Sequence, residues 1–172
     1  MINALIFENY VLTESSGDAK QLYDKSLYGT LLSNGQVKLS FIEALYLVES
    51  KKITLFQGKK ELDFENTLKK AKSFEKTVLT RYAVYKDLRE KGYLVKTALK
   101  FGADFRVYDK GIKPGEDHSK WIVYPVPENQ LFSWYDFAAK NRVAHSTKKR
   151  LMLGIVDDEN DVTYYEIKWA RP

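Results

Sequence analysis

Two side chains capable of acid–base chemistry and one basic run could together form a reaction centre. Tyr108 ends a strand-like segment, His118 precedes the next one across a loop, and Lys148-Lys149-Arg150 follows a helical pattern. Histidine transfers protons near neutral pH, and a lysine ammonium offsets developing negative charge. A tyrosine needs nearby cations to act as a base, because its usual pKa is about 10. This set suits RNA cleavage by internal transesterification, which needs a base, an acid and a cation, but no metal or cofactor.

Each of these residues also has a structural interpretation. Tyr108 is one of twelve tyrosines and can be a core or edge residue. His118 follows two acidic residues, as a surface histidine can, and His145 can order a helix end. The run Lys148–Arg150 can be a solvated turn or a phosphate contact without a catalytic role. The residue pattern by itself leaves both interpretations open.

Most other catalytic motifs are absent from the sequence. It contains no G-x-S-x-G, G-x-x-x-x-G-K-[ST] or G-x-G-x-x-G motif, which excludes the usual signatures of a serine hydrolase and of nucleotide binding. The two histidines lack paired spacing and there is no cysteine, so we predict no metal site. One metal-nuclease pattern stays open, formed by Glu166 and Lys168 with Asp104 as an upstream carboxylate.

Composition indicates a globular protein that is neither disordered nor membranous. The 172 residues are 44% hydrophobic and 30% charged, which suits one or two domains. The net charge of +5 is compatible with a polyanionic partner. We find no apolar run near the roughly 20 residues that span a bilayer and no signal-peptide pattern. With no cysteine to form disulfides, we expect an intracellular, cytoplasmic protein without a membrane partner.

The N-terminal part reads as a small α+β unit. The strongest signals are the Asn34-Gly35 hairpin dipeptide and the Ser40/Glu43 capping box, which starts a helix. We expect a strand or hairpin in residues 1–12, a helix in 14–25 capped by Ser15 or Ser16, hairpin strands 30–33 and 36–39, a strand at 53–56 and a helix capped by Asp63.

Apolar residues at steps of three and four predict one long helix over residues 67–91, stopped by Gly92. We place a domain boundary near Thr77, giving domains 1–76 and 77–172. The second domain should be an α/β or α+β sandwich. We expect strands at 93–98, 103–108 and 121–126, the last ended by Pro125 and Pro127, then a helix at 134–144 capped by Ser133, and strands 151–156 and 162–169 around an acidic turn.

Longer motifs in the second domain carry a resemblance to a known family. These are YKDLREKGYLVKTALKFGADFRVYDKG (85–111), DHSKWIV (117–123) and RVAHSTKKRLMLGIVDDENDVTYYEIKW (142–169), together with LSFIEALYLVE (39–49) in the first domain. They resemble the archaeal tRNA-splicing endonuclease family over most of residues 36–172. Trp121 stands where the family often has a tyrosine.

The resemblance implies a fold and a set of site residues. It implies a small N-terminal α+β domain followed by a C-terminal mixed β-sheet domain with flanking helices, of the restriction-endonuclease-like type. The family's catalytic base falls on Tyr108, its acid on His118 and its transition-state cation on Lys149. Arg142 is the candidate for clamping a bulged base, and Lys148 and Arg150 are further RNA-binding candidates.

The resemblance also implies substrate and partners. The substrate is precursor tRNA with a bulge-helix-bulge, cut without a metal or cofactor to give a 2′,3′-cyclic phosphate and a 5′-hydroxyl. Family members assemble through an acidic loop, which matches Asp157, Asp158, Glu159 and Asp161. We therefore expect self-association or a paralogous subunit, in a homotetramer or heterotetramer. A non-catalytic RNA-binding or assembly subunit is the alternative, although a scaffold has no need of all three catalytic residues.

Overall fold

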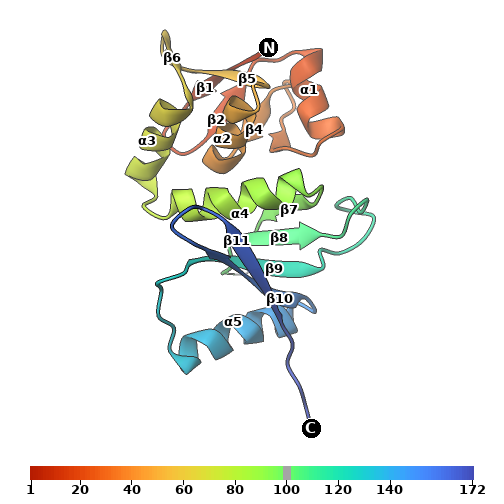
Figure 1. The fold of residues 1–172 in the computed structure, drawn as a ribbon. Helices are drawn as coiled ribbons and strands as arrows, with labels where there is room; N and C mark the ends of the chain where they lie inside the picture. Colours follow the sequence, from red (N-terminus) through yellow and green to blue (C-terminus); the bar gives the residue numbers. More distant parts are fainter. Residues whose placement is uncertain (99–101) are drawn as a thin grey trace. The chain divides into compact units, whose positions relative to one another are not determined.

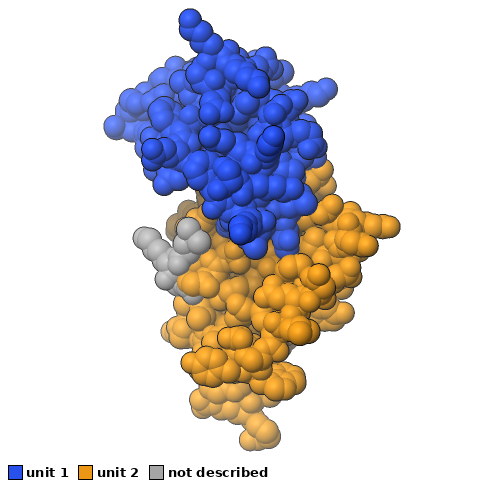
Figure 2. Space-filling view, turned by 90° about the vertical axis from the view of Figure 1, so that its left-hand side faces the viewer, with its two compact units in different colours: residues 1–82 blue, residues 83–172 orange. Residues whose placement is uncertain are grey.

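The computed structural model describes residues 1–98 and 102–172. They form two compact units, Met1–Tyr82 and Ala83–Pro172, which are coloured blue and orange in Figure 2. Each unit contains a mixed sheet with helices (Figure 1), which confirms the predicted α+β fold class. The two units divide within helix α4 (Val78–Glu90), and the predicted domain boundary near Thr77 stays a prediction.

Unit 1 is built on a six-stranded sheet in the order β3-β4-β2-β1-β5-β6. Strand β1 pairs antiparallel with β2 and parallel with β5. The hairpin strand β6 follows β5 and had no counterpart among the predicted strands. The elements of this unit before α4 are β1 (Ile2–Ile6), β2 (Val11–Thr13), α1 (Gly17–Asp24), β3 (Thr30–Leu31), β4 (Val37–Leu39), α2 (Phe41–Glu49), β5 (Ile53–Gln57), β6 (Lys60–Leu62) and α3 (Phe64–Phe74).

The local start and turn signals of unit 1 are confirmed. Ser40 accepts a hydrogen bond from the Glu43 N–H, and the Glu43 carboxylate accepts one from the Ser40 N–H, so the capping box is complete. Ser16 and Asp63 cap α1 and α3 by accepting a hydrogen bond from the N–H three residues later, without the reciprocal bond. Asn34-Gly35 lies in the turn between β3 and β4, where Gly35 has a φ of +83° that glycine adopts without strain.

The predicted single helix over residues 67–91 is wrong, because the chain forms α3 and α4 with a break between them. Glu75 has extended backbone angles and ends α3. Its carboxylate accepts a hydrogen bond from the Thr77 hydroxyl and pairs with Arg81 at 2.6 Å, which stabilises the break. Phe74 is exposed and stacks on Phe41, whereas Val78 is buried. The apolar spacing continues across the break, so it could not distinguish two helices from one.

Unit 2 contains a sheet in the order β11-β10-β9-β8-β7 among its described residues. Strand β9 pairs antiparallel with β8 and parallel with β10, while β10 and β11 form an antiparallel hairpin. The elements after α4 are β7 (Leu94–Thr97), β8 (Phe105–Tyr108), β9 (Trp121–Pro127), α5 (Trp134–Ser146), β10 (Arg150–Val156) and β11 (Val162–Ile167).

Helices α4 and α5 cover opposite faces of this sheet (Figure 1). On one face, Tyr85 of α4 packs against Phe105 of β8. On the other, Ala144 of α5 joins a core with Ile122 and Leu151. Side chains alternate between faces along a strand, so neighbouring residues of β8 to β10 face different helices. Within the described residues, no helix is both long and apolar enough to cross a bilayer.

The expectation that Pro125 and Pro127 end the third strand is wrong for Pro125, which lies within β9, whereas the strand does end at Pro127. The Glu128 N–H donates to Val156 of β10, so the even-numbered residues of β9 direct their N–H groups toward β10. The odd-numbered prolines would direct theirs toward β8, but the pairing of β8 with β9 extends only as far as Val123. No ladder hydrogen bond is lost at either proline, so the strand continues through Pro125 and ends at Pro127.

We predict that Gly154→Ala destabilises unit 2 by about 1–3 kcal/mol. A Cβ at this position of β10 would lie 2.9 Å from a methyl group of Val84 on α4, and Val84 is fully buried. Urea unfolding followed by circular dichroism measures the change.

Gly17→Ala is the matched control, because a Cβ there meets nothing within 4 Å. Its free energy of unfolding should stay within about 0.5 kcal/mol of wild type. Equal stability of the two variants would contradict the close packing of α4 on β10.

Candidate active site

Tyr108 is the last residue of β8, opposite Leu94 of β7. The side chains of β8 alternate between the face toward α4 and the face toward α5, and Tyr108 shares the latter with Arg106. Tyr108 is 4% exposed, so packing holds its ring at the end of the strand. A side chain fixed in this way has little freedom to leave the sheet edge.

His118 lies on the loop that joins β8 to β9, and its side chain is exposed. Its backbone N–H donates to the Asp117 carboxylate at 2.7 Å. The base of the loop is closed by an ion pair of 2.9 Å between Lys120 and Asp109. The hydrogen bond from Lys120, and a second from the Lys110 N–H, lower the pKa of Asp109. The loop therefore returns the chain to the sheet directly after His118.

Lys149 lies in the turn between α5 and β10. Its N–H donates to Ala144, and the preceding residue, Lys148, has a φ of +56° that turns the chain sharply. The Lys149 ammonium reaches the carbonyl oxygen of Ser119 at 3.4 Å. Burial, and next the charge of Arg106, lower the pKa of Lys149. The turn thus carries a partly buried cation to the residue that follows His118.

The three predicted catalytic residues come from one edge of the sheet. Because β9 runs antiparallel to β8 and parallel to β10, the end of β8 and the starts of β9 and β10 lie together. The Lys120 N–H donates to Val107, and the Arg150 N–H donates to the Lys120 carbonyl. These bonds place the chain just before β9 between Tyr108 and Lys149. A phenol, an imidazole and an ammonium at one edge can serve proton transfer and phosphate binding.

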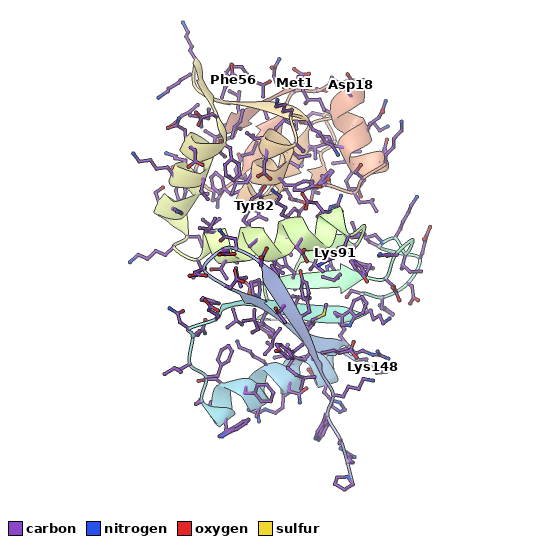
Figure 3. The ribbon with its side chains drawn as sticks, in the orientation of Figure 1. Met1, Asp18, Phe56, Tyr82, Lys91 and Lys148 are labelled. Atoms are coloured by element: carbon purple, nitrogen blue, oxygen red, sulfur yellow. The ribbon has the colours of Figure 1, made fainter. Side chains whose placement is uncertain are left out.

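The three RNA-binding candidates point to different places. Arg142 is exposed on α5, with its guanidinium 5.9 Å from the ring centre of Tyr135. Lys148 is exposed in the turn after α5 and is labelled in Figure 3. Arg150 lies beside Glu166 at 3.2 Å, on the sheet face toward α4. Arg150 therefore does not share a face with the core residues under α5.

Sequence reasoning missed a hollow of about 290 Å³ that borders Lys149. It is also lined by Lys168 and by Trp169, whose ring meets His145 edge-on at 4.1 Å. Trp169 is 52% exposed, and the Arg171 guanidinium lies 4.8 Å from its ring centre. Rings among cations suit a nucleic-acid base beside a phosphate. The sequence feature that could have predicted this hollow is the tryptophan between two basic residues in the segment KWAR (168–171).

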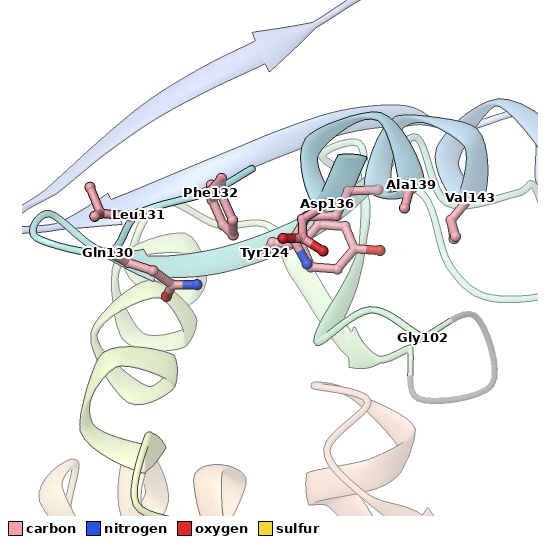
Figure 4. A pocket seen from close by; sticks show the side chains of 9 residues that line it. Gly102, Tyr124, Gln130, Leu131, Phe132, Asp136, Ala139 and Val143 are labelled. Carbon is pink, nitrogen blue, oxygen red and sulfur yellow. The ribbon is translucent and has the colours of Figure 1, made fainter. Parts of the chain in front are cut away.

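A second hollow, of about 370 Å³, lies between β9 and the first half of α5 (Figure 4). Tyr124 lies in it, and burial raises the pKa of this phenol. Lys140 stands over the Tyr124 ring at 4.2 Å. None of the predicted site residues lines this hollow.

The acidic segment 157–161 forms the tight turn between β10 and β11. The Asp157 carboxylate accepts hydrogen bonds of 2.9 Å from the N–H groups of Glu159 and Asp161. Asp158, Glu159 and Asp161 are exposed. Asp157 therefore organises the turn, while the other three acids present their charge to solvent.

The Glu166 carboxylate of the alternative metal-nuclease pattern is engaged with neighbouring side chains. It accepts a hydrogen bond of 2.7 Å from the Trp121 indole and pairs with Arg150. The Trp121 bond is the largest cause of its lowered pKa. Among residues 1–98 and 102–172, no three His, Cys, Asp or Glu side chains gather closely enough to hold a metal ion.

Comparison with known proteins gives matches along both units. Residues 78–164 match the family described as tRNA intron endonuclease, catalytic C-terminal domain, and residues 4–68 match its N-terminal domain. A tRNA-splicing endonuclease of Nanoarchaeum equitans is 45% identical over 85% of this chain and 97% of its own length. That of Thermococcus onnurineus is 45% identical over 88% and 86%. That of Methanothermobacter thermautotrophicus is 38% identical over 96% and 95%.

We predict that Lys149 loses its proton at a lower pH than an ordinary lysine, because burial and the Arg106 charge both disfavour the ammonium form. Its Cε chemical shift, followed by NMR as pH rises, measures the midpoint. Loss of the signal in Lys149→Gln identifies it. A midpoint at or above the usual value of about 10.4 would contradict the arrangement.

Proposed function

The chain belongs to the tRNA intron endonuclease family, and from this premise we propose that it cleaves precursor tRNA at bulge-helix-bulge exon–intron junctions. The reaction is a metal-independent transesterification that leaves a 2′,3′-cyclic phosphate and a 5′-hydroxyl. One observation carries the proposal. The end of β8 and the starts of β9 and β10 meet at the sheet edge from which Tyr108, His118 and Lys149 come.

The three side chains take the roles that the family resemblance implies. Tyr108 removes the proton of the 2′-hydroxyl, and the 2′-oxygen attacks the phosphorus. The bond from phosphorus to the 5′-oxygen breaks, and His118 gives its proton to that oxygen. Lys149 offsets the charge that builds on the phosphate oxygens. One proton enters the protein and one leaves it, so the atoms balance without a cofactor.

RNA recognition is proposed for the cations around this edge. Arg142 on α5 can stack a base that is splayed out of a bulge, because a planar guanidinium packs on aromatic faces. Lys148 in the turn and Arg150 at the start of β10 flank Lys149 and can contact the RNA backbone. Bulges suit this mode, because their unstacked bases are accessible to side chains.

We further propose that the chain acts as an oligomer with itself or with a paralogous subunit. The support is the exposed acidic turn, where Asp158, Glu159 and Asp161 present carboxylates beyond the end of the sheet. Such a turn can dock on a basic surface of another subunit. Two sites at a fixed separation would let one assembly cut both ends of an intron.

The alternative of a non-catalytic subunit accounts for fewer observations. A scaffold needs neither a packed tyrosine at the end of β8 nor a partly buried Lys149 beside the loop of His118. Both features suit catalysis. The cleavage test below separates the two functions.

We predict that the wild-type chain cleaves a bulge-helix-bulge RNA in excess EDTA. His118→Ala and Tyr108→Phe should each reduce the single-turnover rate by about 10²–10⁴-fold, because each removes a proton-transfer group. The rates are measured with end-labelled RNA on denaturing gels.

Tyr165→Phe is the matched control, since it removes a hydroxyl from an exposed ring of β11 and should leave the rate unchanged. Cleavage that disappears with EDTA would contradict the metal-free reaction. Full activity of His118→Ala would contradict its role as the acid.

We predict that the double variant Asp158→Lys/Asp161→Lys forms smaller oligomers and cleaves more slowly. It reverses the exposed charges and leaves Asp157, which holds the turn, in place. Light scattering and the cleavage rate are measured on the same samples.

Asp24→Lys/Glu61→Lys makes the same change in net charge at exposed positions of unit 1. This control should keep the wild-type oligomer. An unchanged oligomer in Asp158→Lys/Asp161→Lys would show that the acidic turn does not dock.

A further inference from the structure

Arg106 stands in the middle of β8, two residues before Tyr108. It is paired across the strands with Ile122 of β9, which belongs to the core under α5. Arg106 therefore faces the same side of the sheet as Tyr108. Strand β8 thus directs Arg106 toward the proposed reaction centre, where Lys149 from the turn before β10 is the other cation.

The guanidinium of Arg106 is incompletely satisfied. Its Nε atom is buried and has no hydrogen-bond partner. Among residues 1–98 and 102–172 its charge is not paired with any carboxylate within ion-pair distance. A buried donor without a partner is unfavourable, and native proteins rarely keep one without a use. An anionic ligand would supply both the missing acceptor and the missing negative charge.

Lys149 shares this shortage of negative charge. Within residues 1–98 and 102–172, the one polar contact of its ammonium is the neutral carbonyl oxygen of Ser119, at the long distance of 3.4 Å. The Arg106 charge is near enough to lower the pKa of Lys149. Two cations held together without an anion repel each other, and a phosphate between them would remove the repulsion. The planar guanidinium fork also matches two phosphate oxygens.

We propose that Arg106 and Lys149 jointly bind the phosphate group at the bond that is cleaved. The guanidinium fork of Arg106 contacts both non-bridging oxygens and Lys149 adds its charge to one of them, while Tyr108 and His118 transfer the protons. Arg106 is then a substrate-binding residue that holds the phosphorus in line for attack. This inference rests on the proposed function, because it assigns a further contact to the same site.

The first test compares cleavage rates of Arg106→Gln and Arg106→Lys with wild type. Arg106→Gln removes the charge and should lower kcat/KM at least tenfold. Arg106→Lys keeps a point charge without the fork and should recover part of that loss. Arg89→Gln on α4 is the matched control, because α4 covers the opposite face of the sheet. It should cleave at the wild-type rate.

The second test needs no cleavage, so it separates this inference from the proposed function. The Lys149 NMR signal is titrated with inorganic phosphate, and separately with bulge-helix-bulge RNA that carries a 2′-deoxy nucleotide at the cleaved position. Arg106→Gln should weaken both interactions at least tenfold. Without ligand, it should also raise the pKa of Lys149, because one neighbouring positive charge is gone.

Several results would overturn the proposal. One is an Arg106→Gln variant that is folded by circular dichroism and has wild-type kcat/KM and phosphate affinity. Another is loss of inorganic phosphate binding with unchanged RNA affinity and rate, which would make this an adventitious anion site. Equal losses in both Arg106 variants with an unaltered Lys149 pKa would indicate a structural role. Wild type that binds phosphate but cleaves no RNA would refute the proposed function alone.

Discussion

The pairing of β9 with its two neighbours is the constraint on which the site depends. β9 runs antiparallel to β8 and parallel to β10, with Trp121 opposite both Val107 and Arg150. This register brings the end of one strand and the starts of two others to a single edge. A shift of β9 by one residue against its neighbours would move every side chain of β9 to the other face of the sheet. The position of Tyr108 at the end of β8, and of the chain on which His118 and Lys149 lie, follows from this ladder.

The same alternation separates two kinds of charge. On the face toward α4, Arg150 is paired with Glu166, and the Tyr164 hydroxyl donates to Asp87. On the face toward α5, the cation Arg106 has no carboxylate partner among the described residues, and Lys149, beside it, contacts only a carbonyl. Compensated charges serve packing, whereas uncompensated cations beside a loop suit an anionic substrate. For binding an anionic substrate, the net charge of +5 is therefore less important than the position of the cations that lack a carboxylate partner.

Local chemistry was predictable from the sequence, and features that depend on tertiary pairing were not. The Ser40 capping box and the Asn34-Gly35 turn are short-range hydrogen-bonding patterns, and both form. The break at Glu75 was invisible because the apolar spacing continues through it. Pro125 was mistaken for a strand end, because its side toward β8 is unpaired only as a result of β8 beginning at Phe105, opposite Val123. The roles of the catalytic candidates were predicted from long family motifs. That Arg106 shares a sheet face with Tyr108 became clear only from the register of β8.

We propose that groups at this edge cleave RNA by internal transesterification. Mass spectrometry of the RNA products formed by the wild-type chain in EDTA tests it most directly, because the end groups record which oxygen attacked the phosphorus. We expect the upstream fragment to end in a 2′,3′-cyclic phosphate and the downstream fragment to begin with a 5′-hydroxyl. An upstream 3′-hydroxyl with a downstream 5′-phosphate would mean that water attacked instead, and would contradict the account.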